Sequence, residues 1–200
     1  MSQDTADCTP DLVVLEGSPS EIGRTLGEMW AEDLVADTED YFRRMKEAGL
    51  EADTLLREGE AYIRVLERVA PHLAEELQAT GAAAGIEADR HTAYTGLKYC
   101  NLERIQQEEE WLEPREGCTS YMAIGSASGL EANLVHKNRD ARQVPQAPVI
   151  RHVSGKHRVL GSSDVGDLGL CHALNSEGLA AKTNTGDPVD IPLRKTISNT

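Results

Sequence analysis

The chain has 200 residues, of which 40% are hydrophobic and only 4% are aromatic, so its core would rest on Leu, Val, Ile and Ala. That length suits one large domain or two small ones. The net charge of −14 argues against nucleic acids and anionic membranes as partners, because both attract basic surfaces. Residues 1–10 lack the regions of a signal peptide, and no apolar run of about eighteen residues exists. We therefore expect a cytoplasmic protein.

The first half of the chain has the hydrophobic spacing of helices. After a short apolar strand at residues 12–15, Ser18, Pro19 and Glu21 have the pattern of a capping box. The helix that it begins carries apolar residues from Ile22 to Leu34. Further helices are predicted at residues 53–69, 71–84 (ended by Gly85) and 89–109.

From Cys118 onward the hydrophobic period changes to that of strands. Residues 125–129 are rich in Ser and Gly and predict a turn between a strand at 119–124 and a return strand at 132–138. Other strands are predicted at 149–153, 158–160 and 179–183, with loops at 161–167 and 185–188. The sequence thus predicts an α+β fold with a helical first half and a strand-rich second half.

The four cysteines are Cys8, Cys100, Cys118 and Cys171. No two of them form a CxxC pair, and none has zinc spacing with a histidine, so we predict no metal site. His152 and His157 are interpreted as a solvent-facing pair rather than as ligands. Reduced thiols in a reducing compartment fit this pattern, and one thiol can then serve as a nucleophile.

Gly117 and Cys118 form the most informative pair in the sequence. A thiolate is a strong nucleophile that needs a base, and a cysteine at a chain terminus carries its own base, the α-amine. To reach that state, the Cys118 thiol would attack the Gly117 carbonyl, and water would hydrolyse the thioester. Gly117 makes a strained turn accessible because it has no Cβ. The alternative interpretation is a buried core cysteine at the start of a strand.

Two polar residues complete the predicted site. Asp140 would end the strand that pairs with the strand of Cys118, where its carboxylate could orient an ammonium group. The charge of Lys137 or Arg139 would favour the thiolate. Asn184 follows an apolar run, and its amide could donate to an oxyanion. Taken alone, Asp140 and Asn184 are also typical of surface turns.

The chain resembles the acyl-coenzyme A:6-aminopenicillanic acid acyltransferase family, which are autoproteolytic N-terminal-nucleophile (Ntn) hydrolases of the peptidase C45 type. The resemblance rests on the segments 16–23, 71–77, 117–120, 138–140 and 174–179. It implies a four-layer αββα Ntn sandwich, with residues 1–117 as the helical N-terminal segment and residues 118–200 as the start of the β subunit.

The resemblance also implies the roles of individual residues. Cleavage between Gly117 and Cys118 would make Cys118 the nucleophile, Asp140 a catalytic partner, and Asn184 the oxyanion donor. Three further residues, Ser120, Lys137 and Arg139, are candidate supporting residues. The implied reaction is cleavage or transfer of an acyl group at an amide bond of a small acylated amine. No cofactor is expected, and an acyl-coenzyme A molecule is a candidate acyl donor.

Family members continue well beyond the segment that corresponds to residues 118–200, so we expect this chain to be a fragment or to need a separate chain for the missing C-terminal half. One alternative is therefore a catalytically inactive fragment or partner subunit that acts as a binding module. Another is an ordinary Cys–His hydrolase that uses His136 or His172 as its base. The residues alone do not choose between hydrolysis and acyl transfer.

Overall fold

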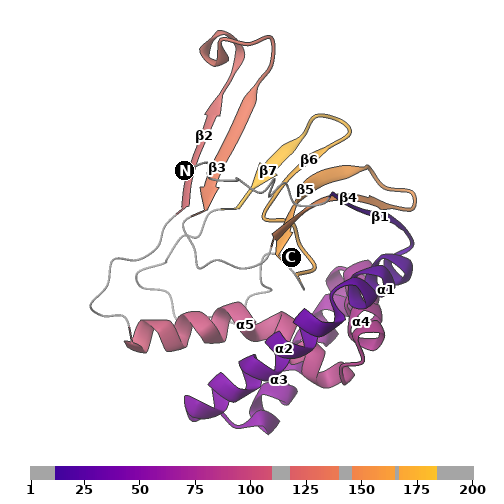
Figure 1. The fold of residues 1–200 in the computed structure, drawn as a ribbon, viewed down its shortest axis with the longest axis vertical. Helices are drawn as coiled ribbons and strands as arrows, with labels where there is room; N and C mark the ends of the chain where they lie inside the picture. The colour runs from indigo at the N-terminus through magenta and orange to yellow at the C-terminus, as the bar shows by residue number, and fades with distance from the viewer. Residues whose placement is uncertain (1–11, 110–117, 140–145, 165–166, 184–200) are drawn as a thin grey trace, which may run out of the picture.

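The computed structural model describes residues 12–109, 118–139, 146–164 and 167–183, and these form an α+β fold (Figure 1). The helices are α1 (Pro19–Met29), α2 (Ala31–Glu47), α3 (Ala52–Val69), α4 (Pro71–Ala84) and α5 (Ala88–Glu109). The strands are β1 (Val13–Gly17), β2 (Cys118–Ala123), β3 (Leu134–Arg139), β4 (Gln146–Val153), β5 (Val159–Asp164), β6 (His172–Asn175) and β7 (Ala180–Lys182).

Local signals set the helix boundaries. The predicted capping box at α1 is confirmed, because the Ser18 hydroxyl accepts from the Glu21 N–H and the Glu21 carboxylate accepts from the Ser18 N–H. Gly85 ends α4 in the left-handed conformation, with φ of 74°. The prediction of one helix running on to Leu34 is wrong in detail, because the backbone departs from helical geometry at Trp30 and α2 begins after it.

The five-stranded sheet has the order β1-β4-β5-β6-β7. Strand β1 runs parallel to β4, whereas the other neighbours are antiparallel. The helical first half therefore contributes an edge strand to the sheet of the second half. The loop predicted at residues 161–167 is partly wrong, because residues 161–164 extend β5. Backbone pairing with β4 holds this Ser- and Gly-containing segment in a strand despite its loop-like composition.

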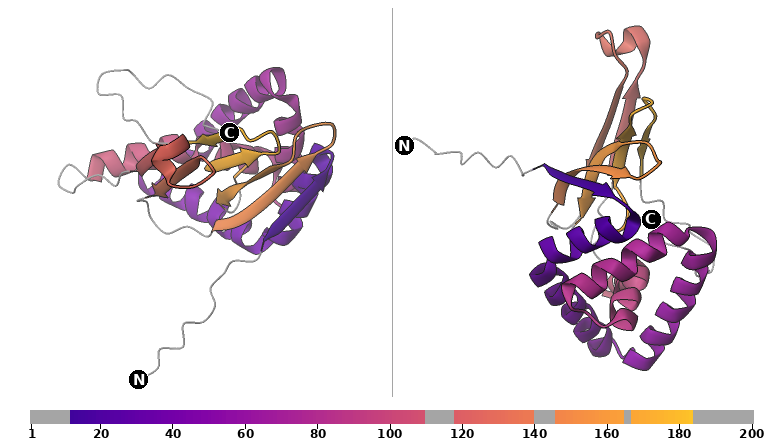
Figure 2. Two further views of the ribbon diagram at one scale, coloured as in Figure 1. Left: turned by 90° about the horizontal axis from the view of Figure 1, so that it is seen from above. Right: turned by 90° about the vertical axis from the view of Figure 1, so that its right-hand side faces the viewer.

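The predicted hairpin is confirmed as β2 and β3, which form a separate two-stranded sheet. The turn between them holds a short 3₁₀ helix at Gly125–Ser128, and Gly129 follows with φ of 65°. The hairpin projects away from the helices beside the β7 edge of the larger sheet (Figures 1 and 2).

The helices pack on one face of the five-stranded sheet (Figure 2). Leu15 of β1 and Val149 of β4 are each 1% exposed and pack against Ile22 and Leu26 of α1. None of the described helices is long and apolar enough to cross a membrane.

The opposite sheet face carries an apolar row of directly paired residues. The row runs across all five strands and consists of Val14, Ile150, Leu160, Leu174 and Ala180. Val14 is 53% exposed, and Leu160 and Leu174 are each 47% exposed. Such a row on one side of a sheet whose other side is buried is typical of a face that packs against a further layer.

Candidate active site

Cys118 begins β2 and pairs directly with Arg139, the last residue of β3. The thiol residue is half-buried, which differs from the buried core cysteine of the alternative interpretation. Asp140 follows Arg139 in the sequence but lies outside the described residues, as does Gly117. The structure thus places Arg139, the residue before Asp140, beside Cys118 at the end of the hairpin nearest the helices.

The two faces of the hairpin carry different side chains. Alternation along β2 puts Cys118 and Ser120 on one face, together with Lys137, which pairs with Ser120. Tyr121 and His136 pair on the other face, where their rings stack with centroids 4.7 Å apart. His136 therefore points away from the thiol, and this disfavours His136 as the base of a Cys–His hydrolase.

Two lysines join the hairpin to the edge strand β7. The Lys137 ammonium donates to the backbone carbonyl of Thr183, and the Lys182 ammonium donates to the carbonyl of Tyr121 at 3.3 Å. Asn184, the next residue after Thr183, lies outside the described residues. The contact with Lys137 brings Thr183, the residue before Asn184, to the hairpin face that carries Cys118 and Ser120.

Strand β6 and the loop before it support Thr183. The Thr183 N–H and hydroxyl both donate to the carbonyl of Cys171, at 3.2 and 3.0 Å. The Cys171 N–H in turn donates to the Ser162 carbonyl at 2.9 Å. The buried Ser163 hydroxyl of β5 donates to the carbonyl of Gly169, in the loop that follows, at 3.1 Å. These bonds hold the end of β7 in position relative to β5.

A buried ion pair between Lys98 of α5 and Asp167 anchors the same loop to the helices. Burial opposes the charged form of Lys98, but the charge of Asp167, together with hydrogen bonds to Asp167 and Tyr94, outweighs burial and raises the pKa of the ammonium. Burial raises the pKa of the Tyr94 hydroxyl, and it also raises that of Asp37, which accepts a long hydrogen bond from Tyr94 at 3.4 Å. The Lys98–Asp167 pair lies in the interior, where it supports the position of the loop.

Sequence reasoning missed a Ser–His contact on the exposed sheet face. The Ser162 hydroxyl lies 3.1 Å from Nε2 of His172, and His172 pairs across the strands with Lys182. No spacing signal marks this contact, because Ser162 and His172 meet only through the pairing of β5 with β6. A strand prediction that included residues 161–164 would have found it.

His152 and His157 each lie near a carboxylate rather than near each other. His152 lies 3.7 Å from Glu16, and His157 lies 3.6 Å from Glu177. Among the residues that the structure describes, no group of three or more His, Cys, Asp or Glu side chains has the arrangement of a metal site.

No protein-family model matches the chain, and no curated protein matches its sequence.

Proposed function

We propose that this chain belongs to a cysteine Ntn hydrolase or acyltransferase of the family that it resembles, with Cys118 as the nucleophile. The observation that carries the proposal is the meeting of three chain segments at one end of the hairpin. Cys118 pairs with Arg139, next to Asp140, while Lys137 holds the carbonyl of Thr183, next to Asn184. The two predicted partners of the thiol are thus adjacent in sequence to residues that lie at the Cys118 end of the hairpin.

The maturation step is an acyl shift followed by hydrolysis. The Cys118 sulfur attacks the Gly117 carbonyl carbon, the C–N bond breaks, and the thiol proton passes to the departing amine. Water then adds its oxygen to the carbonyl carbon and returns a proton to the sulfur, which releases the Gly117 carboxylate. The new α-amine of Cys118 is the general base for later turnovers.

In turnover, the Cys118 sulfur attacks the carbonyl of a small acylated amine and forms a thioester. The amine leaves with the proton that the α-amine has taken from the thiol. Water or a second amine then accepts the acyl group. In this scheme Asp140 orients the ammonium group, and Asn184 donates its amide N–H to the oxyanion. With an acyl-coenzyme A donor, the Cys118 sulfur would attack the acyl carbonyl, coenzyme A would leave as its thiol, and the same acyl-enzyme thioester would form.

The proposed Ntn sandwich also assigns an occupant to the exposed apolar row. In that sandwich a second sheet covers Val14, Leu160 and Leu174 and completes the αββα layers. Face-to-face sheet packing at about 10 Å buries such rows.

The first test is the intact mass of the purified protein beside that of Cys118→Ala. Two fragments that meet at Gly117 and Cys118 are expected in the wild type and are absent from Cys118→Ala. Cys171→Ala is the matched control, because it removes a thiol outside the cleavage junction, and it should still be cut. Hydroxylamine should accelerate cleavage of the wild type, because it attacks the thioester.

An uncut wild-type chain with native circular dichroism would contradict self-processing and favour the alternative, an inactive binding module. Asp140→Asn tests the proposed role of Asp140 while the Cys118 nucleophile stays intact, and this variant should slow the turnover of acylated amines. Normal turnover in that variant would remove Asp140 from the site. The observation that favours the binding module is the exposed row itself, because it would serve a partner equally well without catalysis.

A further inference from the structure

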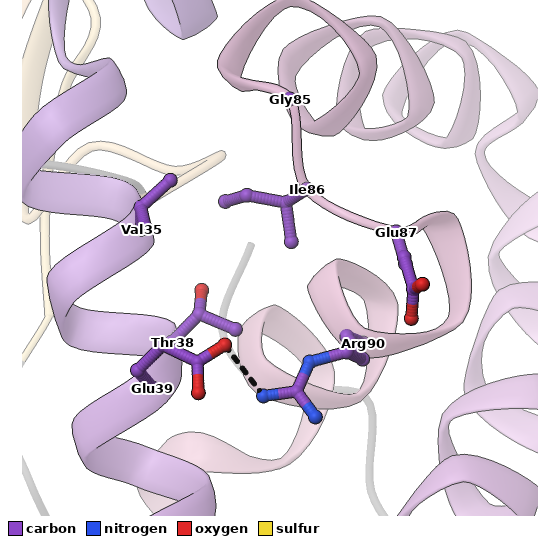
Figure 3. Close-up of a pocket in the computed structure, with 7 residues that line it drawn as sticks. All are labelled: Val35, Thr38, Glu39, Gly85, Ile86, Glu87 and Arg90. Atoms are coloured by element: carbon purple, nitrogen blue, oxygen red, sulfur yellow. Dashed lines mark hydrogen bonds and ion pairs between the residues drawn. The ribbon is translucent and has the colours of Figure 1, made fainter.

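An open pocket of about 320 Å³ lies within the helical layer, away from the β2–β3 hairpin. One wall is α2, with Val35, Thr38 and Glu39, and the other is the turn between α4 and α5 together with the first turn of α5 (Figure 3). This volume is at the small end of the range for ligand sites. The pocket therefore suits a ligand of few atoms.

Thr38 supplies a polar group that nothing in the described chain satisfies. Its side chain is 1% exposed, and its hydroxyl has no hydrogen-bond partner among the described residues. Figure 3 shows the Thr38 side chain on the pocket wall, facing the turn that carries Ile86. A buried hydroxyl without a partner is costly, and a bound ligand with a polar atom would remove that cost.

Arg90 is held in place and keeps most of its donors. Its guanidinium lies 4.2 Å from the centre of the Phe42 ring, and one of its nitrogens donates to Glu39 at 2.8 Å. The Arg90 side chain is 26% exposed, whereas that of Glu39 is 66% exposed. A guanidinium has five N–H donors, so the described contact with Glu39 leaves room for a bidentate carboxylate.

The charges of the pocket are one cation and two anions. Glu87 also lines the pocket, and no ion pair of its side chain occurs within the described residues. A ligand with only a carboxylate would meet Glu39 and Glu87, and a ligand with only an ammonium group would meet Arg90. A zwitterion matches both charges, with its carboxylate at Arg90 and its ammonium group at the two glutamates.

The remaining lining is apolar or open. Val35 is 41% exposed, and Ile86 extends from the turn toward it (Figure 3). Gly85, which ends α4, completes the lining. The two aliphatic side chains would contact a short hydrocarbon chain.

We propose that this pocket binds a free aliphatic α-amino acid, a function separate from the chemistry at Cys118. The carboxylate binds Arg90, the ammonium group binds Glu39 and Glu87, the Thr38 hydroxyl donates to the carboxylate, and the side chain contacts Val35 and Ile86.

The test is an amide-resolved NMR titration of the full chain with L-leucine. Two matched probes are 4-methylpentanoate, which lacks the amine, and 3-methylbutylamine, which lacks the carboxylate. L-leucine should give saturable shifts at Thr38, Gly85 and Ile86 with millimolar affinity, and each one-charge analogue should bind about tenfold more weakly.

Variants make the assignment specific. Thr38→Val should weaken L-leucine binding by about fivefold, because the isosteric change removes only the hydroxyl. Glu87→Gln should weaken it by about threefold and leave 4-methylpentanoate unaffected or better bound. Glu47→Gln, an exposed change on α2 outside the pocket, should bind as the wild type does. The absence of saturable shifts, or equal binding of all three probes, would overturn the proposal.

Discussion

At the scale of single residues, the buried imidazole of His91 makes stability depend on pH. It is 2% exposed in α5, and a Cβ at Gly81 would lie only 2.7 Å from its ring, so α4 packs directly on the imidazole. No described residue pairs with its Nδ1 atom. Burial, with a smaller contribution from the Lys98 charge, lowers the pKa of His91 to about 4. The folded protein therefore keeps this imidazole neutral.

This neutrality predicts acid sensitivity. Below its usual pKa of 6.5, His91 takes up a proton in the unfolded chain, but the folded chain does so only near pH 4. Stability contributed by His91 is therefore present above pH 6.5 and lost as the pH falls through that window, by about 3 kcal/mol in all. Urea unfolding should show a flatter pH dependence for His91→Leu than for the wild type.

The matched control for this experiment is His72→Leu. His72 is exposed on α4, so its replacement should leave the wild-type pH dependence in place. If His91→Leu and the wild type lost stability in parallel between neutral and acid pH, the buried imidazole would not be the source.

At the scale of elements, α1 packs on α4 more closely than any other pair of the described helices. A Cβ at Gly23 would lie 2.3 Å from the Glu76 carbonyl oxygen, and one at Gly27 would lie 2.3 Å from that of Thr80. Both glycines are buried. The two helices thus touch through backbone atoms, which is possible only because these positions lack side chains.

This contact predicts a penalty that helix propensity alone does not. Alanine normally stabilises a helix by about 1 kcal/mol relative to glycine. At Gly23 or Gly27 the added methyl group must push α1 from α4, so we expect a net loss of about 1–3 kcal/mol. Thermal unfolding measures it, with Arg24→Ala on the exposed side of α1 as the control. A gain in stability for Gly23→Ala would show that the interface can spread at little cost.

At the scale of the whole molecule, two buried ion pairs join the helices to the sheet and its loop. Lys98 of α5 pairs with Asp167, and Arg151 of β4 pairs with Glu76 of α4. The Arg151 guanidinium also donates to the carbonyl of Leu168 at 3.0 Å. Burial raises the pKa of the Glu76 carboxyl, and the charge of Arg151 opposes that rise.

Removal of one partner should therefore destabilise the assembly of the layers. Arg151→Met leaves Glu76, which is 1% exposed, without its cation, and we expect a loss of about 3–5 kcal/mol. Without Arg151 the pKa of Glu76 rises further. The loss should thus be larger in mildly basic than in mildly acidic buffer, where Glu76 can take up a proton.

Urea unfolding at the two pH values measures this effect. Arg158→Met is the control, because Arg158 is 60% exposed beside Glu16. Glu76→Gln added to Arg151→Met should recover part of the loss by removing the uncompensated charge. Equal stability of Arg151→Met and the wild type in basic buffer would mean that water reaches Glu76.

Much of the fold follows from neighbouring residues. The capping box at Ser18 and the left-handed Gly85 act within one helical turn, so the sequence predicts both helix ends correctly. The turn at residues 125–129 brings β3 back onto β2 for the same local reason. The boundary at Trp30 was missed because apolar spacing continues across it, and β5 was cut short because Gly161 and Ser162 favour loops in isolation.

The candidate site also combines residues that the sequence identifies with contacts that depend on the tertiary structure. Residue chemistry and the family resemblance select Gly117, Cys118, Asp140 and Asn184, and of these four the structure describes Cys118. The contact between Lys137 and Thr183, and that between Ser162 and His172, depend on which strands become neighbours. No local pattern records those pairings.

Helix starts such as that at Ser18, the change of hydrophobic period at Cys118 and the Gly117–Cys118 pair can all be read from a few adjacent residues. Pairing in three dimensions is what joins β1 to β4, brings Arg90 to Glu39 and Phe42 beside a buried Thr38, and leaves an apolar row exposed on one sheet face. These contacts join distant parts of the chain, and their free energy comes from packing whole layers together rather than from the preferences of any one segment.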